Sequence, residues 1–173
     1  MIETTVQKTY TDFILPPTIV SKIDIARMMS EAEQVDSDMT ASDVRAKTGV
    51  TTPIAPILSE LFEQFLAQNE LKFVTSLERT ELIEQLRLLK DNVPIIHMTF
   101  AVEADRESLS QLVAWLRESI HSQAVIAVGL QPALVAGVYL RTPNHVHDLS
   151  MRAALNSSHD LLVKELETLR GRS

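Results

Sequence analysis

Cysteine is absent from this chain of 173 residues, and glycine is scarce, with four residues. The missing thiols exclude disulfides, thiolate zinc sites and cysteine nucleophiles, and they suit a reducing compartment. The glycines stand at positions 49, 129, 137 and 171 and form no phosphate-binding loop, and no serine lies in a G-x-S-x-G setting. The sequence therefore gives no sign of a nucleotide-binding loop or of a serine nucleophile.

Positive charge is also in the minority, with 16 Lys and Arg against 23 Asp and Glu, for a net charge of −7. The basic residues are scattered, which works against binding to a nucleic-acid backbone. The uncharged run from Ser119 to Leu140 is interrupted by polar residues and is patterned as two strands, so it does not predict a membrane span. The first ten residues lack a basic segment followed by an apolar one, so we expect no signal peptide. We expect membrane contact only through partners.

The first third of the chain has mostly helical periodicity. Residues 1–17 lack periodicity and end in two prolines, which predicts a lead-in arm. One helix is expected from about Thr18 to Gln34, and a short one from Ala41 to Lys47 that ends at Gly49. Carboxylates gather at the end of the first helix and just after it, and they predict a solvated helix end and loop or, as the alternative, an acidic patch that binds a partner. They are Glu31, Glu33, Asp36 and Asp38.

Two further helices follow before residue 92. Apolar residues repeat at helical spacing from Ile57 to Leu66, and Thr75 to Glu78 has the form of a capping box ahead of a second apolar stripe. These stripes either pack on each other inside a bundle or form a groove for another protein's helix. On the second alternative, the candidate partner contacts are Leu58, Phe62 and Phe65. Residues 1–92 are assigned to an N-terminal helical domain.

The hydrophobic period changes from helical to alternating at residues 91–94. A strand is expected from Ile96 to Ala104 and a helix from Arg106 to His121. Two more strands are expected over residues 124–130 and 134–142, and a last helix over 150–169. The fold class is α+β, with an N-terminal helical bundle followed by a small β-α-β-β-α domain over residues 93–173.

The last helix carries an apolar stripe that is expected to face the sheet, formed by Met151, Leu155, Leu162, Leu166 and Leu169. Leu161 and Val163 border this stripe on either side. They are the second group of candidate partner contacts.

The segment from Gln131 to Arg152 contains the most informative motif. In the strand, Gly137 lies opposite an apolar face, where a missing side chain lets neighbouring backbone come close. Pro143 and Asn144 predict a turn. Asp148 and Ser150 then predict a helix start, because their side chains accept hydrogen bonds from the N–H groups of a first helical turn.

This motif resembles the C-terminal signature of the delta subunit of rotary ATP synthases, the homologue of the oligomycin-sensitivity-conferring protein. The matching residues are Gln131, Leu134, Gly137, Arg141, Asp148, Ser150 and Arg152. The chain departs from the family pattern at Ala136, where the first glycine of a pair is usual, and at Pro143 and Asn144, which replace a turn glycine. It departs again at Leu149, where glycine is usual.

The resemblance implies a non-catalytic subunit of the peripheral stalk of a proton-translocating ATP synthase, without cofactor. By the same resemblance, its N-terminal domain binds the N-terminal helices of the alpha subunits, and its C-terminal domain binds the C-termini of the b subunits. The subunit is then peripheral, on the cytoplasmic face of the plasma membrane. The alternative is a small nucleic-acid- or ribosome-associated module, although the chain lacks a G-x-x-G loop and basic clusters. A third class is an enzyme.

The five histidines offer one weak metal motif. His145, His147 and Asp148 place two imidazoles and a carboxylate on a short segment. No fourth ligand lies nearby in the sequence, so solvated turn histidines are the preferred interpretation and no metal site is assigned. His97, His121 and His159 are expected to face solvent.

Overall fold

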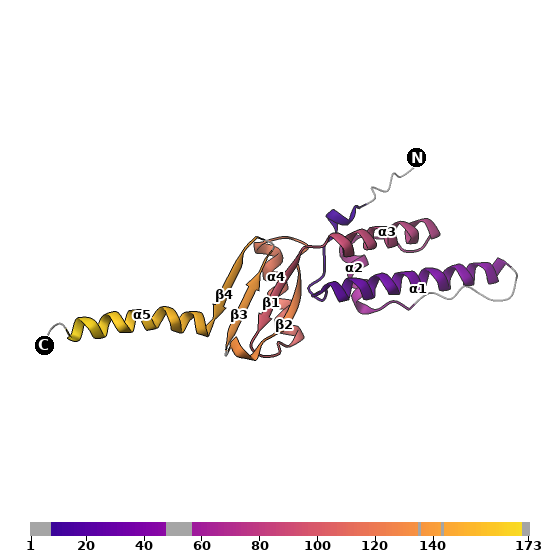
Figure 1. Ribbon diagram of the computed structural model, residues 1–173. Coiled ribbons are helices and arrows are strands. Elements are labelled where there is room, and N and C mark those ends of the chain that lie inside the picture. Colours follow the sequence, from indigo (N-terminus) through magenta and orange to yellow (C-terminus); the bar gives the residue numbers. More distant parts are fainter. Residues whose placement is uncertain (1–7, 48–56, 135, 143, 171–173) are drawn as a thin grey trace. The chain divides into compact units, whose positions relative to one another are not determined.

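The computed structural model describes residues 8–47, 57–134, 136–142 and 144–170 (Figure 1). In the last helix it describes the side chains of residues 151–156, 158, 159, 163 and 164. The chain divides into two compact units. Unit 1 comprises Met1–Pro94 with Ser110–Val125, and unit 2 comprises Ile95–Leu109 with Ile126–Ser173.

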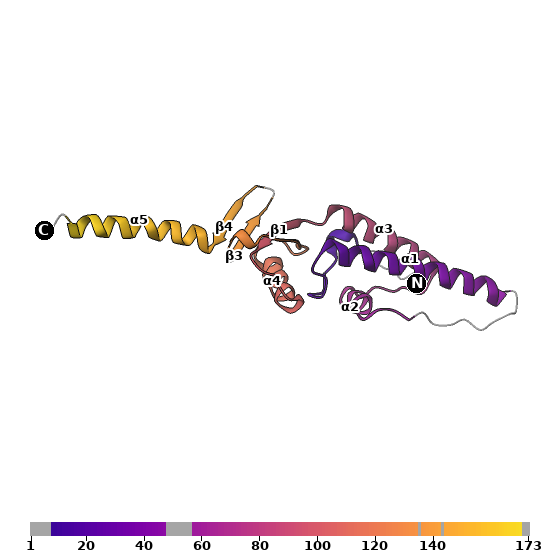
Figure 2. The same ribbon diagram turned by 60° about the horizontal axis from the view of Figure 1, so that its bottom comes forward.

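The core of unit 1 forms around two long helices. Helix α1, Lys22–Lys47, lies along helix α3, Ser76–Asn92, in both views (Figures 1 and 2). Both helices bury apolar side chains completely, among them Ile25, Met28 and Leu86. Full burial of one such side chain stabilises a fold by about 1.5 to 3 kcal/mol relative to exposure. This pair of helices is therefore the rigid base of unit 1.

Helix α1 continues unbroken through the acidic residues, so the expected helix end and loop, and the separate short helix from Ala41, are wrong. The expected stop at Gly49 lies outside the described residues. The carboxylates of α1 reach α3: Asp36 accepts a hydrogen bond from Nε of Arg79 at 2.6 Å, and Glu33 pairs with Arg87 at 3.1 Å. Because Arg79 is almost completely buried, the Asp36 pair is the more important of the two.

Helix α2, Glu60–Asn69, begins at a conventional N-cap and ends in a left-handed residue. Ser59 accepts a hydrogen bond from the N–H of Phe62, and its own N–H and hydroxyl donate to the carboxylate of Glu31 at 2.6 Å each. The chain leaves the helix at Glu70 with φ 54°. Glu31 thereby fixes the start of α2 against α1.

The capping box expected at the start of α3 is confirmed. The Thr75 hydroxyl accepts from the N–H of Glu78, and the Glu78 carboxylate accepts from the N–H groups of Thr75 and Val74. Hydrogen bonds from the Thr75 backbone are the main cause that lowers the pKa of Glu78. The box satisfies N–H groups that a helix start otherwise leaves unpaired.

Residues 9–20, which we call the N-terminal strap, include most of the predicted lead-in arm and pack against the rest of unit 1. The strap contains a short 3-10 helix, η1, Tyr10–Asp12, and its side chains Phe13, Leu15 and Ile19 are buried. The predicted lead-in arm is thus part of the core of unit 1 over its described residues. The apolar residues were too irregularly spaced to reveal the packing in advance.

Two side chains from much later in the sequence hold the strap by its backbone. Arg117 in α4, Arg106–Ser119, donates from Nη1 to the carbonyls of Leu15 (2.9 Å) and Pro16 (2.8 Å), and from Nη2 to that of Ile19 (2.5 Å). Its Nε donates to the carbonyl of Ala124 at 3.1 Å.

The second side chain is that of Gln123, which is 5% exposed. Its amide nitrogen donates to the carbonyls of Tyr10 (2.6 Å) and Phe13 (2.9 Å). These bonds explain why Ser110–Val125 belongs to unit 1. One boundary of the units falls at Pro94, next to the expected division at residues 92 and 93, but the helical unit also takes in this later segment.

Unit 2 is built on a sheet whose described strands have the order β2-β1-β3-β4. The strands are β1 (Ile95–Phe100), β2 (Val125–Leu130), β3 (Gly137–Arg141) and β4 (Val146–Ser150). Strand β3 is antiparallel to β1 and to β4. Strand β2 runs parallel to β1, since the N–H of Val125 donates to Pro94 at one end and that of Gln131 donates to Phe100 at the other.

The α+β class is confirmed, and after residue 93 the order of strands and α-helices differs from the expected one by a single strand. Strand β4 was not predicted, because its two apolar residues, Val146 and Leu149, do not alternate with polar ones and four of its five residues are exposed. It pairs with β3 through the backbone over its whole length. The expected strand from residue 134 begins at Gly137 instead, after the short 3-10 helix η2, Pro132–Leu134.

The last helix, α5 (Met151–Arg170), begins where it was expected but does not bury the start of its apolar stripe. Met151 is 50% exposed and Leu155 is 61% exposed, so the expectation that these residues face the sheet is wrong. The side chains of Leu162, Leu166 and Leu169, which complete the predicted stripe, lie outside the described ones.

We predict that Arg117→Met destabilises the protein by about 2 to 4 kcal/mol, because methionine keeps the stem but leaves buried carbonyls of the strap without donors. Urea unfolding followed by circular dichroism measures the change. Arg27→Met on the exposed face of α1 is the control, and it should change the free energy of unfolding by less than about 0.5 kcal/mol. Equal stability of the Arg117→Met variant and the wild type would contradict the role of this arginine.

Candidate functional site

The motif found in the sequence folds into the hairpin of β3 and β4 and the start of α5. Gly137 has φ 95°, and it is the register partner of Ser150. A Cβ at Gly137 would lie 2.4 Å from the carbonyl oxygen of Leu149 and 2.7 Å from Cα of Ser150. The expectation that a missing side chain lets backbone approach here is confirmed, and only glycine fits without strain.

Ser150, the last residue of β4, caps the start of α5. Its hydroxyl accepts a hydrogen bond from the N–H of Ala153 at 3.3 Å, and it is 2% exposed. The N–H of Met151 donates to the carbonyl of Ala136 at 2.8 Å, which ties the first residue of the helix to the start of β3. The direction in which α5 leaves the sheet is therefore fixed by backbone contacts around Gly137 and Ser150.

Asp148 lies in β4 and does not cap the helix directly, which corrects part of the expectation. Its carboxylate accepts a hydrogen bond at 3.0 Å from the N–H of Ser150, the residue whose side chain caps the helix. Hydrogen bonds from Ser150, with a smaller effect from the positive charge of Arg152, lower the pKa of Asp148. Asp148 thus supports the cap residue, and Arg152 in the first turn is exposed.

The remaining motif residues lie along the chain that leads into the hairpin. Gln131 is exposed at the end of β2, and its carbonyl accepts from the N–H of Leu134, which is buried in η2. Arg141 is exposed at the end of β3. The structure brings together Gly137 and Ser150 as a register pair, whereas Gln131 and Leu134 shape the connection from β2.

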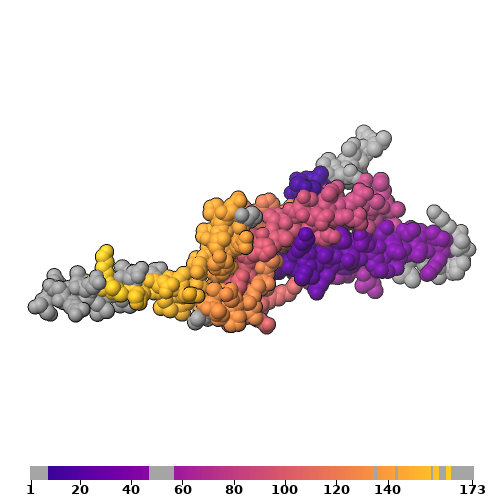
Figure 3. Space-filling view, in the orientation of Figure 1, coloured from indigo at the N-terminus to yellow at the C-terminus, as the bar shows by residue number. Residues whose placement is uncertain are grey.

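A group of exposed apolar side chains surrounds the hairpin and α5. It comprises Val146 and Leu149 of β4 and Met151, Leu155 and Val163 of α5, which are between 40% and 64% exposed. On the face seen in Figure 3, no other element covers the coloured side chains of α5. We call these five residues the C-terminal apolar edge. The β4 members could not be found from the sequence, since the strand itself was not predicted.

The residues predicted to contact a partner differ in how exposed their side chains are. Phe62 and Phe65 are completely buried and pack edge-to-face on Phe73 and Phe13, each with ring centroids 5.2 Å apart. They are core residues, so their assignment as accessible contacts is corrected. Leu58 is partly exposed, and Val163 is exposed on α5. The side chain of Leu161 lies outside the described ones.

The histidine motif forms no metal site among the described residues. The rings of His145 and His147 stack with centroids 6.1 Å apart, and both side chains are exposed. No group of three or more histidine, cysteine or acidic residues in the described ranges is arranged to hold a metal ion. His97, His121 and His159 are exposed, as expected.

No protein-family model matches this sequence, and no curated protein is significantly similar to it. The resemblance to the delta subunit therefore depends on the residues of the hairpin and the start of α5. Within the described residues, no helix combines the length and the apolar character needed to cross a bilayer.

We predict that Gly137→Ala destabilises unit 2 by about 1 to 3 kcal/mol, because alanine must adopt a left-handed backbone conformation and meets the backbone of β4. Thermal unfolding with near-ultraviolet and far-ultraviolet circular dichroism measures the effect. Gly129→Ala is the control, because its added Cβ would meet at 3.2 Å only the movable side-chain oxygen of Thr99. If the two alanine variants have the same melting temperature, the close approach at Gly137 does not contribute to stability.

Proposed function

We propose that this chain is the delta-like subunit of the peripheral stalk of a proton-translocating ATP synthase. In this role it tethers the catalytic head to the membrane-anchored b subunits and performs no chemistry. The C-terminal apolar edge carries the proposal. It lies on the hairpin and helix that contain the family-like motif, which is where the resemblance implies that the stalk binds.

The structure around Gly137 and Ser150 supports a mechanical role. A tether must hold its contact surface in a fixed direction, and the start of α5 is bound on both sides of the hairpin by backbone contacts. The exposed Met151 and Leu155 are four residues apart and share one face of the helix. A face of this kind suits packing against another amphipathic helix, with anchors at i and i+4.

Unit 1 supplies the proposed contact with the catalytic head. Because Phe62 and Phe65 belong to the core, the N-terminal helices of the alpha subunits must bind other side chains. Leu77 and Leu88 of α3 are exposed apolar residues of the right kind. In this proposal, torque passes from the head through the packed helices of unit 1, and the membrane is reached only through the b subunits at its cytoplasmic face.

The direct test is purification of the native complex through a tag on this chain, followed by identification of the partners by mass spectrometry. The proposal requires alpha and b subunits in the same detergent-solubilised complex. Recovery of nucleic acid or ribosomal proteins in their place would support the alternative function and reject the stalk assignment.

We predict that Leu155→Glu weakens capture of a C-terminal fragment of the b subunit by about tenfold or more, because a carboxylate would be buried against apolar side chains. The melting temperature should stay unchanged, since Leu155 is exposed. Isothermal calorimetry on the full-length chain gives the affinity. Asn156→Glu, one residue along the same helix, adds the same charge at a neighbouring exposed position and should retain binding.

A further inference from the structure

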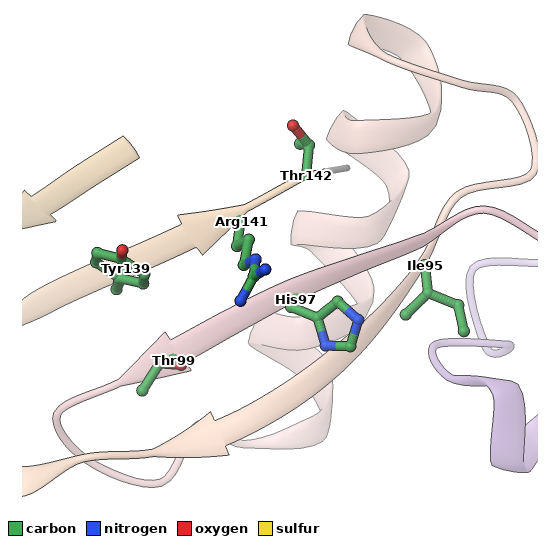
Figure 4. A pocket seen from close by; sticks show the side chains of 6 residues that line it. All are labelled: Ile95, His97, Thr99, Tyr139, Arg141 and Thr142. Carbon is green, nitrogen blue, oxygen red and sulfur yellow. The ribbon is translucent and has the colours of Figure 1, made fainter. Parts of the chain in front are cut away.

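One face of the sheet in unit 2 carries a hollow of about 580 Å³ whose lining includes donor side chains from two adjacent strands. His97 and Thr99 come from β1, and Tyr139 and Arg141 come from β3. His97 is the register partner of Arg141, and Thr99 is the register partner of Tyr139. Figure 4 shows the guanidinium of Arg141 extending from β3 toward β1, beside the imidazole of His97.

The donor side chains of this hollow have no acceptor among the residues that the structure describes. Among the described residues, none forms a hydrogen bond or ion pair with the side chains of His97, Thr99, Tyr139 or Arg141. The other polar residue of the lining, Thr142, already exchanges hydrogen bonds with the backbone of His145 at 3.0 and 3.1 Å. Four adjacent side chains with donor groups are therefore free to bind a ligand.

The charge of the hollow is opposite to that of the whole chain. The protein has a net charge of −7, yet no carboxylate is among the residues that line the hollow. The nearest acidic residue by register is Asp148, the partner of Tyr139 on β4, and its carboxylate already accepts the N–H of Ser150. A positive, acceptor-poor surface on an acidic protein is complementary to an anion.

We propose that this hollow binds a phosphate group, as free phosphate or as part of a small phosphomonoester, between Arg141 and His97. A guanidinium provides up to five donors in a planar fork, and phosphate oxygens accept several hydrogen bonds each. The imidazole and the hydroxyls of Thr99 and Tyr139 supply further donors on the same face. The site is built from side chains, so it requires no glycine-rich loop.

The volume of the hollow favours a phosphomonoester over free phosphate as the ligand. Small-molecule sites usually measure about 300 to 1,000 Å³, so the hollow has room for more than a phosphate ion. The ring of Tyr139 and the side chain of Ile95 line the remaining space. We therefore expect phenyl phosphate to bind more tightly than inorganic phosphate.

The test is a titration of the full-length protein, labelled with nitrogen-15, at constant pH and ionic strength. The probes are phenyl phosphate, inorganic phosphate, benzoate and chloride, and the readout is the amide chemical shift of each residue. We predict saturable shifts centred on β1 and β3 with the two phosphates. Arg141→Gln should raise the dissociation constant about tenfold or more, because it removes the charged donor.

Arg27→Gln is the matched control, since it removes an exposed arginine from α1 in unit 1 and should leave phosphate binding unchanged. If Arg141→Gln does not fold, His97→Gln and Thr99→Val serve in its place, each with an expected loss of affinity. Equal binding by the two phosphates would assign the site to free phosphate.

Three results would overturn the proposal: shifts no larger than those with chloride, binding retained by Arg141→Gln, or benzoate as tight as phenyl phosphate. The inference is independent of the stalk assignment. Leu155→Glu should bind phenyl phosphate as the wild type does, so failure of one proposal leaves the other to be judged by its own measurement.

Discussion

The guanidinium of Arg117 connects the beginning of the chain to its second half. It donates to four backbone carbonyls, three of them in the N-terminal strap and one at Ala124. Burial lowers the pKa of Arg117 to about 10, which still leaves the group charged at neutral pH. A partly buried charge is costly unless its donors are used, and the carbonyls of the strap meet that requirement. The strap and the segment Ser110–Val125 consequently form one unit with the helices of residues 22–94.

Local rules predicted the features whose partners lie close in the sequence. The capping box of Thr75 and Glu78 spans three residues, and the cap of Ser150 on α5 has the same span. Gly137 was recognised because a strand rarely tolerates glycine without a reason, and the structure supplies that reason in the backbone of β4. The change of hydrophobic period near residue 93 likewise marked the start of the sheet.

Contacts between residues that are far apart in the sequence could not be predicted from local patterns. Asp36 and Glu33 have the composition of a solvated loop, but their arginine partners lie 43 and 54 residues away on α3. The bonds of Arg117 to the strap span about 100 residues, and nothing near position 117 signals them. Strand β4 is short and exposed, so its pairing with β3 depends on backbone hydrogen bonds that carry no hydrophobic pattern.

The proposed phosphate site also depends on residues that are far apart in the sequence. The sequence placed Arg141 in the family-like motif and His97 on the polar face of a strand, 44 positions apart in the printed numbering. Only the antiparallel register of β1 and β3 puts them opposite each other. A scan for phosphate-binding loops cannot find a site of this kind, because its donors are side chains on two strands rather than consecutive backbone N–H groups.

Helix α5 presents a free-energy problem that bears on its role. It has 20 residues, and helices in proteins owe most of their stability to the packing of an amphipathic face against other elements. The Ser150 cap contributes about 1 kcal/mol, and Met151 and Leu155, which would stabilise the helix by burial, remain exposed. Packing of this face against a second amphipathic helix would supply the missing apolar contact. The exposed apolar side chains at the start of α5 are thus the part of unit 2 on which the proposed contact with the stalk depends.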